Sequence, residues 1–371
     1  MKITVSQETL KAALGRINNV VCSASSATPI LGHFLLMAKE GKVTIRATDQ
    51  RIATRGPLEA TIAEEGLICP PARKLLEIVK ELEEGDVVLE SKDPAWLNVS
   101  FGKSKFKLAC LKPEDFPSWP AMKKEQSFAL KAGEIADMLE KTVYCTGEGD
   151  AKYTLNGVLF HIQPAEKTLT VAATDGHRMS VVTKDVLAGG EEKKLIVPKK
   201  AATEFKKFIV DPEAIVTVAY TANHLFVKIG EIDFMALLIE GTYPAYNQVI
   251  PQNNPKKVAV VSSALVSSLR KTMILSREGN KSVKLDVAPG TIALSSGSAE
   301  LGEANDSLPV EYDGDPLTIA FNPVLLLEAV QAFEKTGVEK VTLSFDQPLT
   351  PALVSNNGGK DHLCVVMPIR L

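Results

Sequence analysis

An internal threefold repeat is the feature of this 371-residue sequence that most restricts how it can fold. Each third opens with a short β-type run, followed by apolar residues spaced three and four apart. This spacing is typical of a helix that lies on a core. The apolar positions are Leu10, Leu14, Ile17 and Val21 in the first third, Ile135, Leu139 and Val143 in the second, and Leu265, Leu269 and Met273 in the last.

A second helix is predicted in each third, after an apolar strand and near a proline. The three junctions read Ile68-Cys69-Pro70, Ile196-Val197-Pro198 and Ala320-Phe321-Asn322-Pro323. Proline is tolerated there because the first amides of a helix have no intrahelical partner. Between the two helices, residues 42–49 and 168–175 both end in Ala-Thr-Asp, with a looser counterpart at 291–298.

These repeats predict an α+β fold of three similar modules, each with two helices and antiparallel sheets. Corresponding positions are about 120–130 residues apart, which is a normal domain size. We place the modules at residues 1–124, 125–253 and 254–371, with proline-rich joins near Phe116 to Pro120 and Val249 to Pro251. Chance similarity between unrelated α+β segments is the alternative.

Composition indicates a soluble, cytoplasmic protein without a membrane span. Apolar residues make up 45% of the chain and charged residues 23%. Met1 leads into Lys2-Ile3-Thr4-Val5 without a signal-type leader, and no apolar run approaches the roughly 20 residues that a span needs. An odd number of cysteines without Cys-x-x-Cys spacing favours buried thiols over disulfides or zinc ligands. These are Cys22, Cys69, Cys110, Cys145 and Cys364.

The motifs that could indicate an enzyme are incomplete. Asp175 and His177 could perform acid–base chemistry, but no Gly-x-Ser-x-Gly nucleophile motif accompanies them. Residues 297–303 have the spacing of a phosphate loop, yet Glu303 stands where lysine is required and would repel phosphate. The remaining histidines lack metal-ligand spacing. We therefore expect a protein without catalytic activity, metal or cofactor.

Charge separates the predicted helices from the rest of the chain. The six helix windows, residues 7–21, 70–82, 131–144, 198–209, 262–277 and 322–335, hold 15 basic and 9 acidic residues. They carry a net charge of +6 in a chain whose total is −3, so the remainder carries −9. Either the helices expose lysine and arginine to water, or they share a face toward phosphates.

Helix width indicates how many chains a DNA-binding ring would need. A helix is about 10 Å wide, so six side by side give a circumference of about 60 Å and a hole of only about 9 Å. Twelve helices, from two chains, leave about 28 Å, enough for a duplex about 20 Å across. Scattered cations on phosphates would attach loosely and without reading sequence, which permits sliding.

The chain resembles the β subunit of bacterial DNA polymerase III, the β sliding clamp family, from end to end. The most specific segments are Thr28-Pro29-Ile30-Leu31-Gly32, Tyr153-Thr154-Leu155-Asn156-Gly157, Ala173-Thr174-Asp175-Gly176-His177-Arg178, Tyr243-Pro244-Ala245-Tyr246 and Val366-Met367-Pro368-Ile369-Arg370-Leu371. The resemblance implies a head-to-tail homodimer ring on double-stranded DNA, loaded by an ATP-driven clamp loader. It also implies a pocket for short peptide motifs of the replicative polymerase, the loader and repair proteins.

The resemblance assigns residues to the peptide pocket and to the contact between chains, and the predicted helices supply the cations expected to face DNA. An apolar cleft would accept the leucine or phenylalanine anchors of a peptide, with polar groups that fix its register. The pocket would be lined by Leu155, Thr174, Gly176, His177, Arg178, Met179, Pro244, Val249, Asn322, Leu349, Pro351, Val365, Val366, Met367, Pro368, Ile369, Arg370 and Leu371. Phe106 and Leu108 of one chain would meet Ile274 and Leu275 of the other. The cations expected to face DNA are Lys11, Arg16, Arg73, Lys74, Lys80, Lys141, Lys199, Lys200, Lys206, Lys207, Arg270 and Lys271.

Three positions depart from the family pattern. Asn280 replaces an aromatic residue, Gln248 replaces a basic one, and the loop at Cys22 to Ser26 lacks an expected arginine. These departures affect the peptide preference and one loop contact to DNA. Two other classes stay open: a hydrolase or transferase, which would need a polar cleft with perturbed titratable groups, and a repeat scaffold that binds proteins but not DNA.

Overall fold

The computed structural model describes the chain except for residues 23–27, 121–125, 150–151, 189–190, 276–281, 299–301, 357–358, 360 and 371. The chain divides into two compact units. Unit 1 comprises Met1–Gly133 and Lys200–Leu238, and unit 2 comprises Glu134–Lys199 and Ile239–Leu371. The central third of the sequence therefore contributes to both units.

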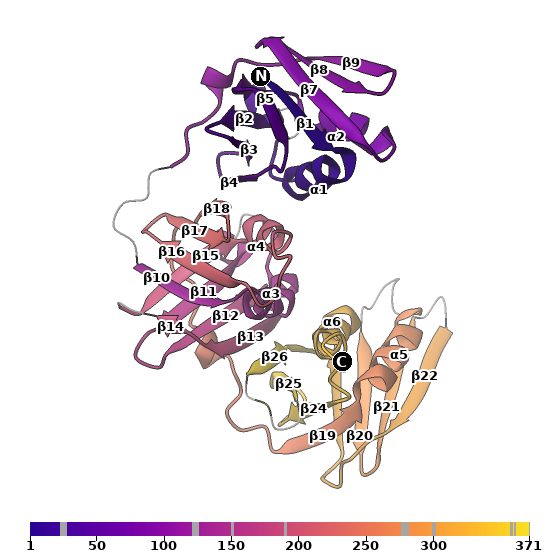
Figure 1. The fold of residues 1–371 in the computed structure, drawn as a ribbon. Helices are drawn as coiled ribbons and strands as arrows, with labels where there is room; N and C mark the ends of the chain where they lie inside the picture. The colour runs from indigo at the N-terminus through magenta and orange to yellow at the C-terminus, as the bar shows by residue number, and fades with distance from the viewer. Residues whose placement is uncertain are drawn as a thin grey trace. The chain divides into compact units, whose positions relative to one another are not determined.

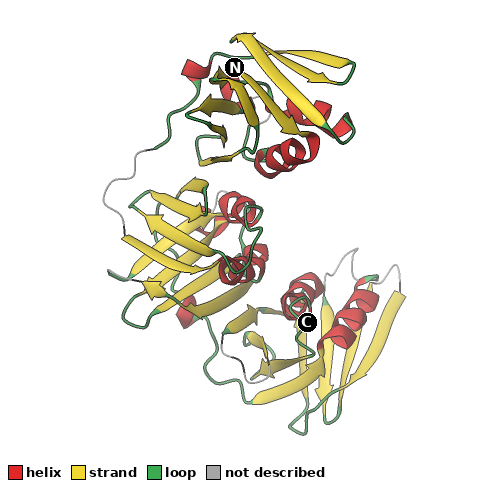
Figure 2. Cartoon of the chain, viewed as in Figure 1, coloured by secondary structure: helices red, strands yellow, loops and turns green. Residues whose placement is uncertain are grey.

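Each third contains two α-helices beside antiparallel strands, as the repeat predicts (Figure 2). The prolines lie at helix starts: Pro71 caps the second helix and Pro323 is the first residue of the last. The α+β prediction is confirmed. The helices are α1 (Gln7–Ile17), α2 (Ala72–Glu81), α3 (Ala132–Glu140), α4 (Lys199–Lys206), α5 (Ser262–Met273) and α6 (Pro323–Glu334).

Unit 1 holds two sheets (Figure 1). One has the order β5-β1-β7-β8-β9, and in the other the order β10-β16-β17-β18-β4-β3-β2-β6 joins strands of the central third to strands of the first. The strands of the first sheet are β1 (Lys2–Ser6), β5 (Thr61–Glu64), β7 (Asp86–Asp93), β8 (Trp96–Phe101) and β9 (Ser104–Ala109). Those of the second are β2 (Leu35–Lys39), β3 (Lys42–Thr48), β4 (Ile52–Pro57), β6 (Gly66–Ile68), β10 (Gln126–Lys131), β16 (Ile215–Tyr220), β17 (His224–Ile229) and β18 (Ile232–Leu237).

Unit 2 repeats this arrangement. Its eight-stranded sheet has the order β15-β11-β12-β13-β26-β25-β24-β19, and its five-stranded sheet has the order β22-β21-β20-β23-β27. The first comprises β11 (Gly157–Gln163), β12 (Thr168–Thr174), β13 (Arg178–Asp185), β15 (Lys193–Pro198), β19 (Lys256–Val261), β24 (Lys340–Phe345), β25 (Ala352–Asn356) and β26 (His362–Val366). The second comprises β20 (Val283–Ala288), β21 (Thr291–Ser298), β22 (Gly302–Pro309), β23 (Leu317–Phe321) and β27 (Pro368–Ile369).

The helices bury the apolar faces that their spacing predicts. Leu10 and Leu14 of α1 are fully buried, as are Leu265 and Leu269 of α5. In the last third these side chains join a core with the inward residues of β20, β21, β23 and β24. Complete burial of one such aliphatic side chain contributes about 1.5–3 kcal/mol, so packing holds these short helices in place.

The helices are shorter than the sequence windows, and this changes the charge count. Between their observed ends they carry ten basic and nine acidic residues, a net charge of only +1. Lys131 lies in β10, and Lys141 and Lys207 follow the ends of α3 and α4. The apolar spacing continues past the end of α1 because Val20 and Val21 stay buried in the following turn. The prediction that the helices themselves carry a large positive charge was therefore wrong.

Candidate functional site

The Ala-Thr-Asp-Gly-His-Arg motif forms a tight turn between β12 and β13. The carboxylate of Asp175 accepts hydrogen bonds from the backbone N–H groups of His177 (2.8 Å) and Arg178 (3.0 Å). Gly176 adopts a φ of +90°, which an L side chain rarely does. Asp175 therefore shapes the turn, and His177 is left exposed at its tip.

Arg178 anchors this turn to its surroundings. Its Nε donates to Asp175 at 3.0 Å, its Nη2 donates to the backbone carbonyl of Tyr144 at 2.8 Å, and its Nη1 donates to Glu328 of α6. Burial is the largest single influence and lowers the pKa of Arg178, but the hydrogen bond to Glu328 and the nearby Cys145, Glu328 and Asp175 together raise the pKa, so the guanidinium keeps its charge. The guanidinium of Arg178, a predicted pocket residue, is thus bound by groups of the protein itself.

The end of the chain is built into both sheets of unit 2. Strand β26 lies between β13 and β25, where Val366 pairs with Arg178 and Ala352. The backbone N–H of Met367 donates to the carbonyl of His177 at 2.9 Å, and β27 pairs with β23. Pro351 stands immediately before β25. Arg370 is exposed, and Leu371 lies outside the described residues.

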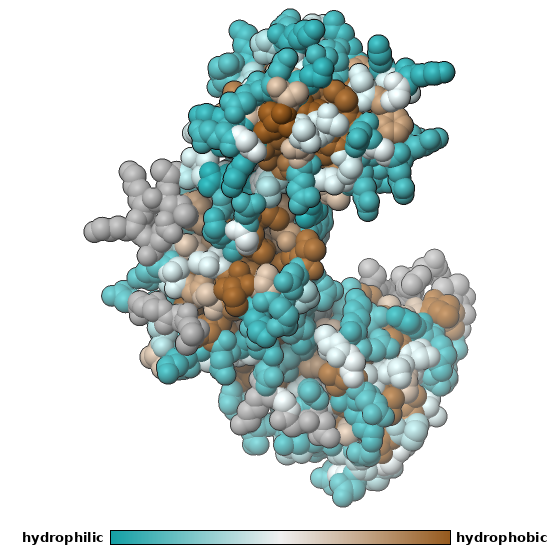
Figure 3. Space-filling view, viewed as in Figure 1, coloured by the Kyte–Doolittle hydropathy of each residue, from teal (hydrophilic) through white to brown (hydrophobic). Residues whose placement is uncertain are grey.

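An apolar cluster connects several predicted pocket residues. Leu155, Met179 and Val365 are buried together with Tyr243, and Tyr246 and Ile250 pack against them. Val249, Leu349 and Met367 leave 46%, 58% and 36% of their surface exposed. Figure 3 shows hydrophilic side chains over most of the viewed face, with apolar residues gathered in patches among them. The turn, the tail strands and this cluster bring most predicted pocket residues together within unit 2.

Other members of the predicted pocket have structural contacts of their own. The side chain of Asn322 caps α6 by accepting from the N–H of Val324 at 3.0 Å. Thr174 donates through Oγ1 to the carbonyl of Arg178 at 2.7 Å. Pro244 is exposed in the segment that follows Tyr243. The side chains of Asn322 and Thr174 are therefore engaged in hydrogen bonds within the protein.

Three residues that hold the segment after Tyr243 were not among the predicted site residues: Tyr246, His161 and Glu192. Tyr246 contacts His161, and His161 contacts Glu192. The motif Tyr243-Pro244-Ala245-Tyr246 was a signal for the first of them, because two tyrosines flanking a turn usually bury their rings. Nothing in the local sequence connects the other two with Tyr246.

The predicted DNA-facing cations fall into two groups. Lys11, Arg73, Lys80 and Arg270 are exposed, Arg16 and Lys206 are half-buried, and none of the ion pairs among the described residues involves the first four. The others bind nearby acids, in the pairs Lys74–Glu77, Lys141–Asp137, Lys199–Glu148, Lys200–Asp49, Lys207–Glu204 and Lys271–Asp306. Lys141 keeps only 15% of its side chain exposed, which makes it a poor candidate for a phosphate contact.

The four predicted interface residues lie near the ends of sheets. Phe106 and Leu108 are half-buried on β9, the terminal strand of its sheet in unit 1. Ile274 follows α5 with 67% of its surface exposed, and Leu275 is half-buried beside it. Helix α5 packs on β22, the terminal strand of a sheet in unit 2.

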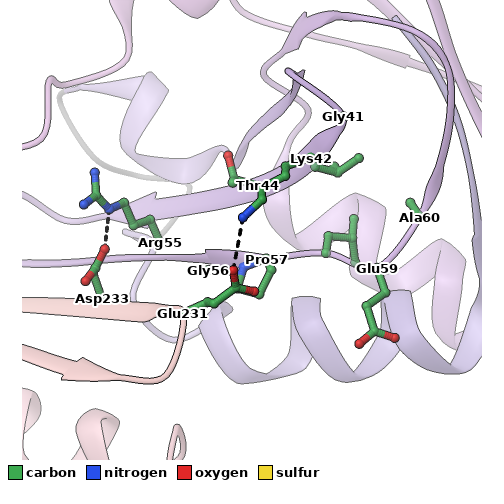
Figure 4. A pocket seen from close by; sticks show the side chains of 12 residues that line it. Gly41, Lys42, Thr44, Arg55, Gly56, Pro57, Glu59, Ala60, Glu231 and Asp233 are labelled. Atoms are coloured by element: carbon green, nitrogen blue, oxygen red, sulfur yellow. Dashed lines mark hydrogen bonds and ion pairs between the residues drawn. The ribbon is translucent and has the colours of Figure 1, made fainter.

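A cavity of about 330 Å³ lies in unit 1, and none of the predicted site residues lines it (Figure 4). Strands β3, β4 and β18 form its wall, where Lys42 pairs with Glu231 at 3.2 Å and Arg55 with Asp233 at 2.7 Å. Both cations of the wall are thus already neutralised. Within the described part of the chain, no cluster of three or more histidine, cysteine, aspartate or glutamate side chains could hold a metal ion. No described helix is long and apolar enough to cross a membrane.

Three repeated α+β modules with paired helices and sheets that run between modules define a protein of the sliding-clamp class. Family models match the chain in three consecutive parts: the N-terminal domain of the DNA polymerase III beta subunit at residues 1–120, its central domain at 129–245 and its C-terminal domain at 247–370. The chain belongs to the DNA polymerase III beta subunit family.

Named relatives support this family assignment over the full length of the chain. The beta sliding clamp of Vibrio cholerae is 31% identical over 373 residues, and that of Pseudomonas putida is 30% identical, each with 100% of both chains covered. A Pseudomonas aeruginosa sliding clamp bound to griselimycin superposes with a TM-score of 0.94 at 28% identity, and a Bartonella birtlesii clamp bound to the same compound with 0.92 at 29%, again with 100% of both chains covered. The chain is a sliding clamp, a non-catalytic processivity factor of DNA replication, and the enzyme alternatives are set aside.

Proposed function

We propose that two copies of this chain form a head-to-tail ring around duplex DNA in the cytoplasm. The ring would hold the replicative polymerase, the clamp loader and repair proteins on the DNA through their short peptide motifs. The three modules at 1–124, 125–253 and 254–371 would each supply a pair of helices to the inner wall. The observation that carries this proposal is the pair of complementary open sheet edges on one chain.

The two edges differ in charge, which favours a head-to-tail contact. Strand β9 exposes Lys105 and Lys107, which alternate along the strand with Phe106 and Leu108. Strand β22 exposes Glu303, whereas its Asp306 is paired with Lys271 of α5, the helix that Ile274 follows. Opposite charges would attract β9 of one copy to β22 of the next, whereas two β9 edges would repel. A heterologous contact of this kind closes into a ring when the rotation suits.

The apolar surface of unit 2 is the proposed peptide site. Val249 and Met367 would receive the apolar anchors of a peptide above the buried Leu155, Met179 and Val365. Methionine suits a surface that accepts several partners, because its side chain is flexible and polarisable.

The exposed Lys11, Arg73, Lys80 and Arg270 are the cations we assign to DNA, since the paired lysines have neighbouring acids to satisfy them.

Retention on closed DNA tests the ring. The protein is loaded onto nicked circular DNA with a clamp loader and ATP, isolated by gel filtration, and the DNA is then cut once. We expect the protein to stay on circular DNA and to leave within minutes of linearisation, because topology rather than affinity retains it. Equal release from circular and linear DNA would overturn the proposal.

A further inference from the structure

The segment from Tyr243 to Val249 has little backbone structure of its own. It contains one short 3-10 turn at Tyr246–Gln248, and the N–H of Val249 donates to the carbonyl of Tyr246 at 3.2 Å. Its place on unit 2 therefore depends on side chains that reach into the protein. Tyr243 supplies one such anchor, because its hydroxyl accepts from the N–H of Thr174 at 3.1 Å.

Tyr246 supplies the second anchor through a chain of side chains. Its hydroxyl lies 2.9 Å from Nδ1 of His161, and the two rings meet edge to face with centroids 5.9 Å apart. Nε2 of the same histidine lies 2.6 Å from Oε1 of Glu192. His161 is buried in β11, and Glu192 directly precedes β15, which pairs with β11. These linked side chains thus connect the segment at residues 243–249 to the eight-stranded sheet.

The proton positions in this chain follow from the chemistry of its members. The hydrogen bond from His161 lowers the pKa of Glu192, so its carboxylate is ionised and can only accept. Nε2 of His161 must then carry the hydrogen. In the neutral ring, Nδ1 is left as an acceptor for the hydroxyl of Tyr246. Both ring nitrogens are satisfied with one proton, which fixes the ring in a single orientation.

We propose that His161 is a positioning residue of the peptide site: held by Glu192, it fixes Tyr246 and thereby the segment that presents Pro244 and Val249. This inference rests on the proposed peptide site. A segment held in its binding conformation before the peptide arrives loses less freedom on binding. His161 and Glu192 would therefore set affinity without touching the peptide.

Peptide binding by the full-length protein tests the inference. The probe is a synthetic peptide of the polymerase C-terminal tail, titrated by calorimetry. We expect Tyr246→Phe and His161→Leu each to raise Kd by about five- to tenfold, because each removes the hydrogen bond that links Tyr246 to His161. The double variant should bind the peptide no more weakly than either single variant, since both substitutions act through the same series of hydrogen bonds. Glu192→Gln, which keeps an acceptor for Nε2, should raise the peptide Kd less than Glu192→Ala does.

A second readout separates positioning from general damage. Amide hydrogen exchange should rise at residues 243–249 in Tyr246→Phe and stay unchanged in β11 and β15, because the ring still fills its place in the apolar cluster. His224→Leu on β17 of unit 1 is the matched control and should leave Kd unchanged. Wild-type affinity in both Tyr246→Phe and His161→Leu overturns the inference.

Val249→Ala distinguishes failure of the positioning role from failure of the proposed peptide site. If Val249→Ala weakens binding while the His161 and Tyr246 variants do not, the peptide site stands and the positioning role is wrong. If the wild-type protein does not bind the peptide, or Val249→Ala leaves Kd unchanged, the proposed site and the inference are both overturned.

Discussion

At the residue scale, His362 gives unit 2 a dependence on pH. Its ring is stacked on Phe333 with centroids 4.1 Å apart, and Nε2 lies 3.1 Å from the hydroxyl of Ser180. Burial, with a smaller contribution from Lys141, lowers the pKa of His362 from 6.5 to about 3. The folded protein therefore keeps this ring neutral where the unfolded chain protonates it.

The sign of the effect follows from this difference. Above about pH 6.5 the ring is neutral in both states, so His362 costs no stability. As the pH falls toward 3, only the unfolded chain takes up the proton, and the free energy of unfolding drops by about 1.4 kcal/mol per pH unit. We expect His362→Gln to remove this part of the slope in urea unfolding between pH 6.5 and 4. His177→Gln, at an exposed position, should keep it, and parallel curves for all three proteins would contradict the assignment.

At the element scale, neighbouring residues at the end of the chain have different roles, one in stability and the next in the proposed binding of peptides. Val366 is fully buried in the core of the last third, whereas the next residue, Met367, is exposed. Deleting residues 366–371 would therefore remove core packing and β27 together with the proposed peptide contact. Two neighbouring single substitutions separate these roles.

We expect Val366→Ala to lower the free energy of unfolding by about 2 kcal/mol, through lost burial and a residual cavity. Met367→Ala should change stability by less than about 1 kcal/mol but weaken binding of the polymerase tail peptide about tenfold. Urea unfolding and calorimetry measure the two quantities. Equal peptide affinity in Met367→Ala and the wild-type protein would show that the peptide binds elsewhere.

At the scale of the whole molecule, the exposed apolar residues after α5 predict an obligate contact between copies. Ile274 is among the most exposed large apolar side chains of the described chain, and a partner that covers it would remove this apolar surface from water. Replacing Ile274 and Leu275 by alanine should remove about 3 kcal/mol from each of the two contacts in the ring, about 6 kcal/mol in all and a roughly 10⁴-fold rise in the dimer Kd. We expect monomers at micromolar concentration in sedimentation velocity. Val261→Ala, also at a partly exposed apolar position, should remain dimeric, and a dimer in the double variant would place the contact elsewhere.

Much of the fold could be predicted because repeats and periodicities are local properties of a sequence. Leu10, Leu14, Leu265 and Leu269 are buried on the helix faces that the spacing predicted. Helix ends were less predictable: Val20 stays buried beyond the end of α1, since apolar spacing reports burial and not backbone conformation. Residue identity likewise marked the segment at Asp175 and the tail at Val366 as family motifs, but not the contacts that each makes.

The sequence by itself determined the threefold repeat, the α+β class, the apolar faces and the residues that mark the family. Only the tertiary structure decided that the central third is divided between two units, that Lys200 is paired with the distant Asp49, and that His161 links Tyr246 to Glu192. The physical reason is the same in each case. Periodicity and turn chemistry depend on neighbours along the chain, whereas strand pairing and side-chain ion pairs depend on which distant segments pack together.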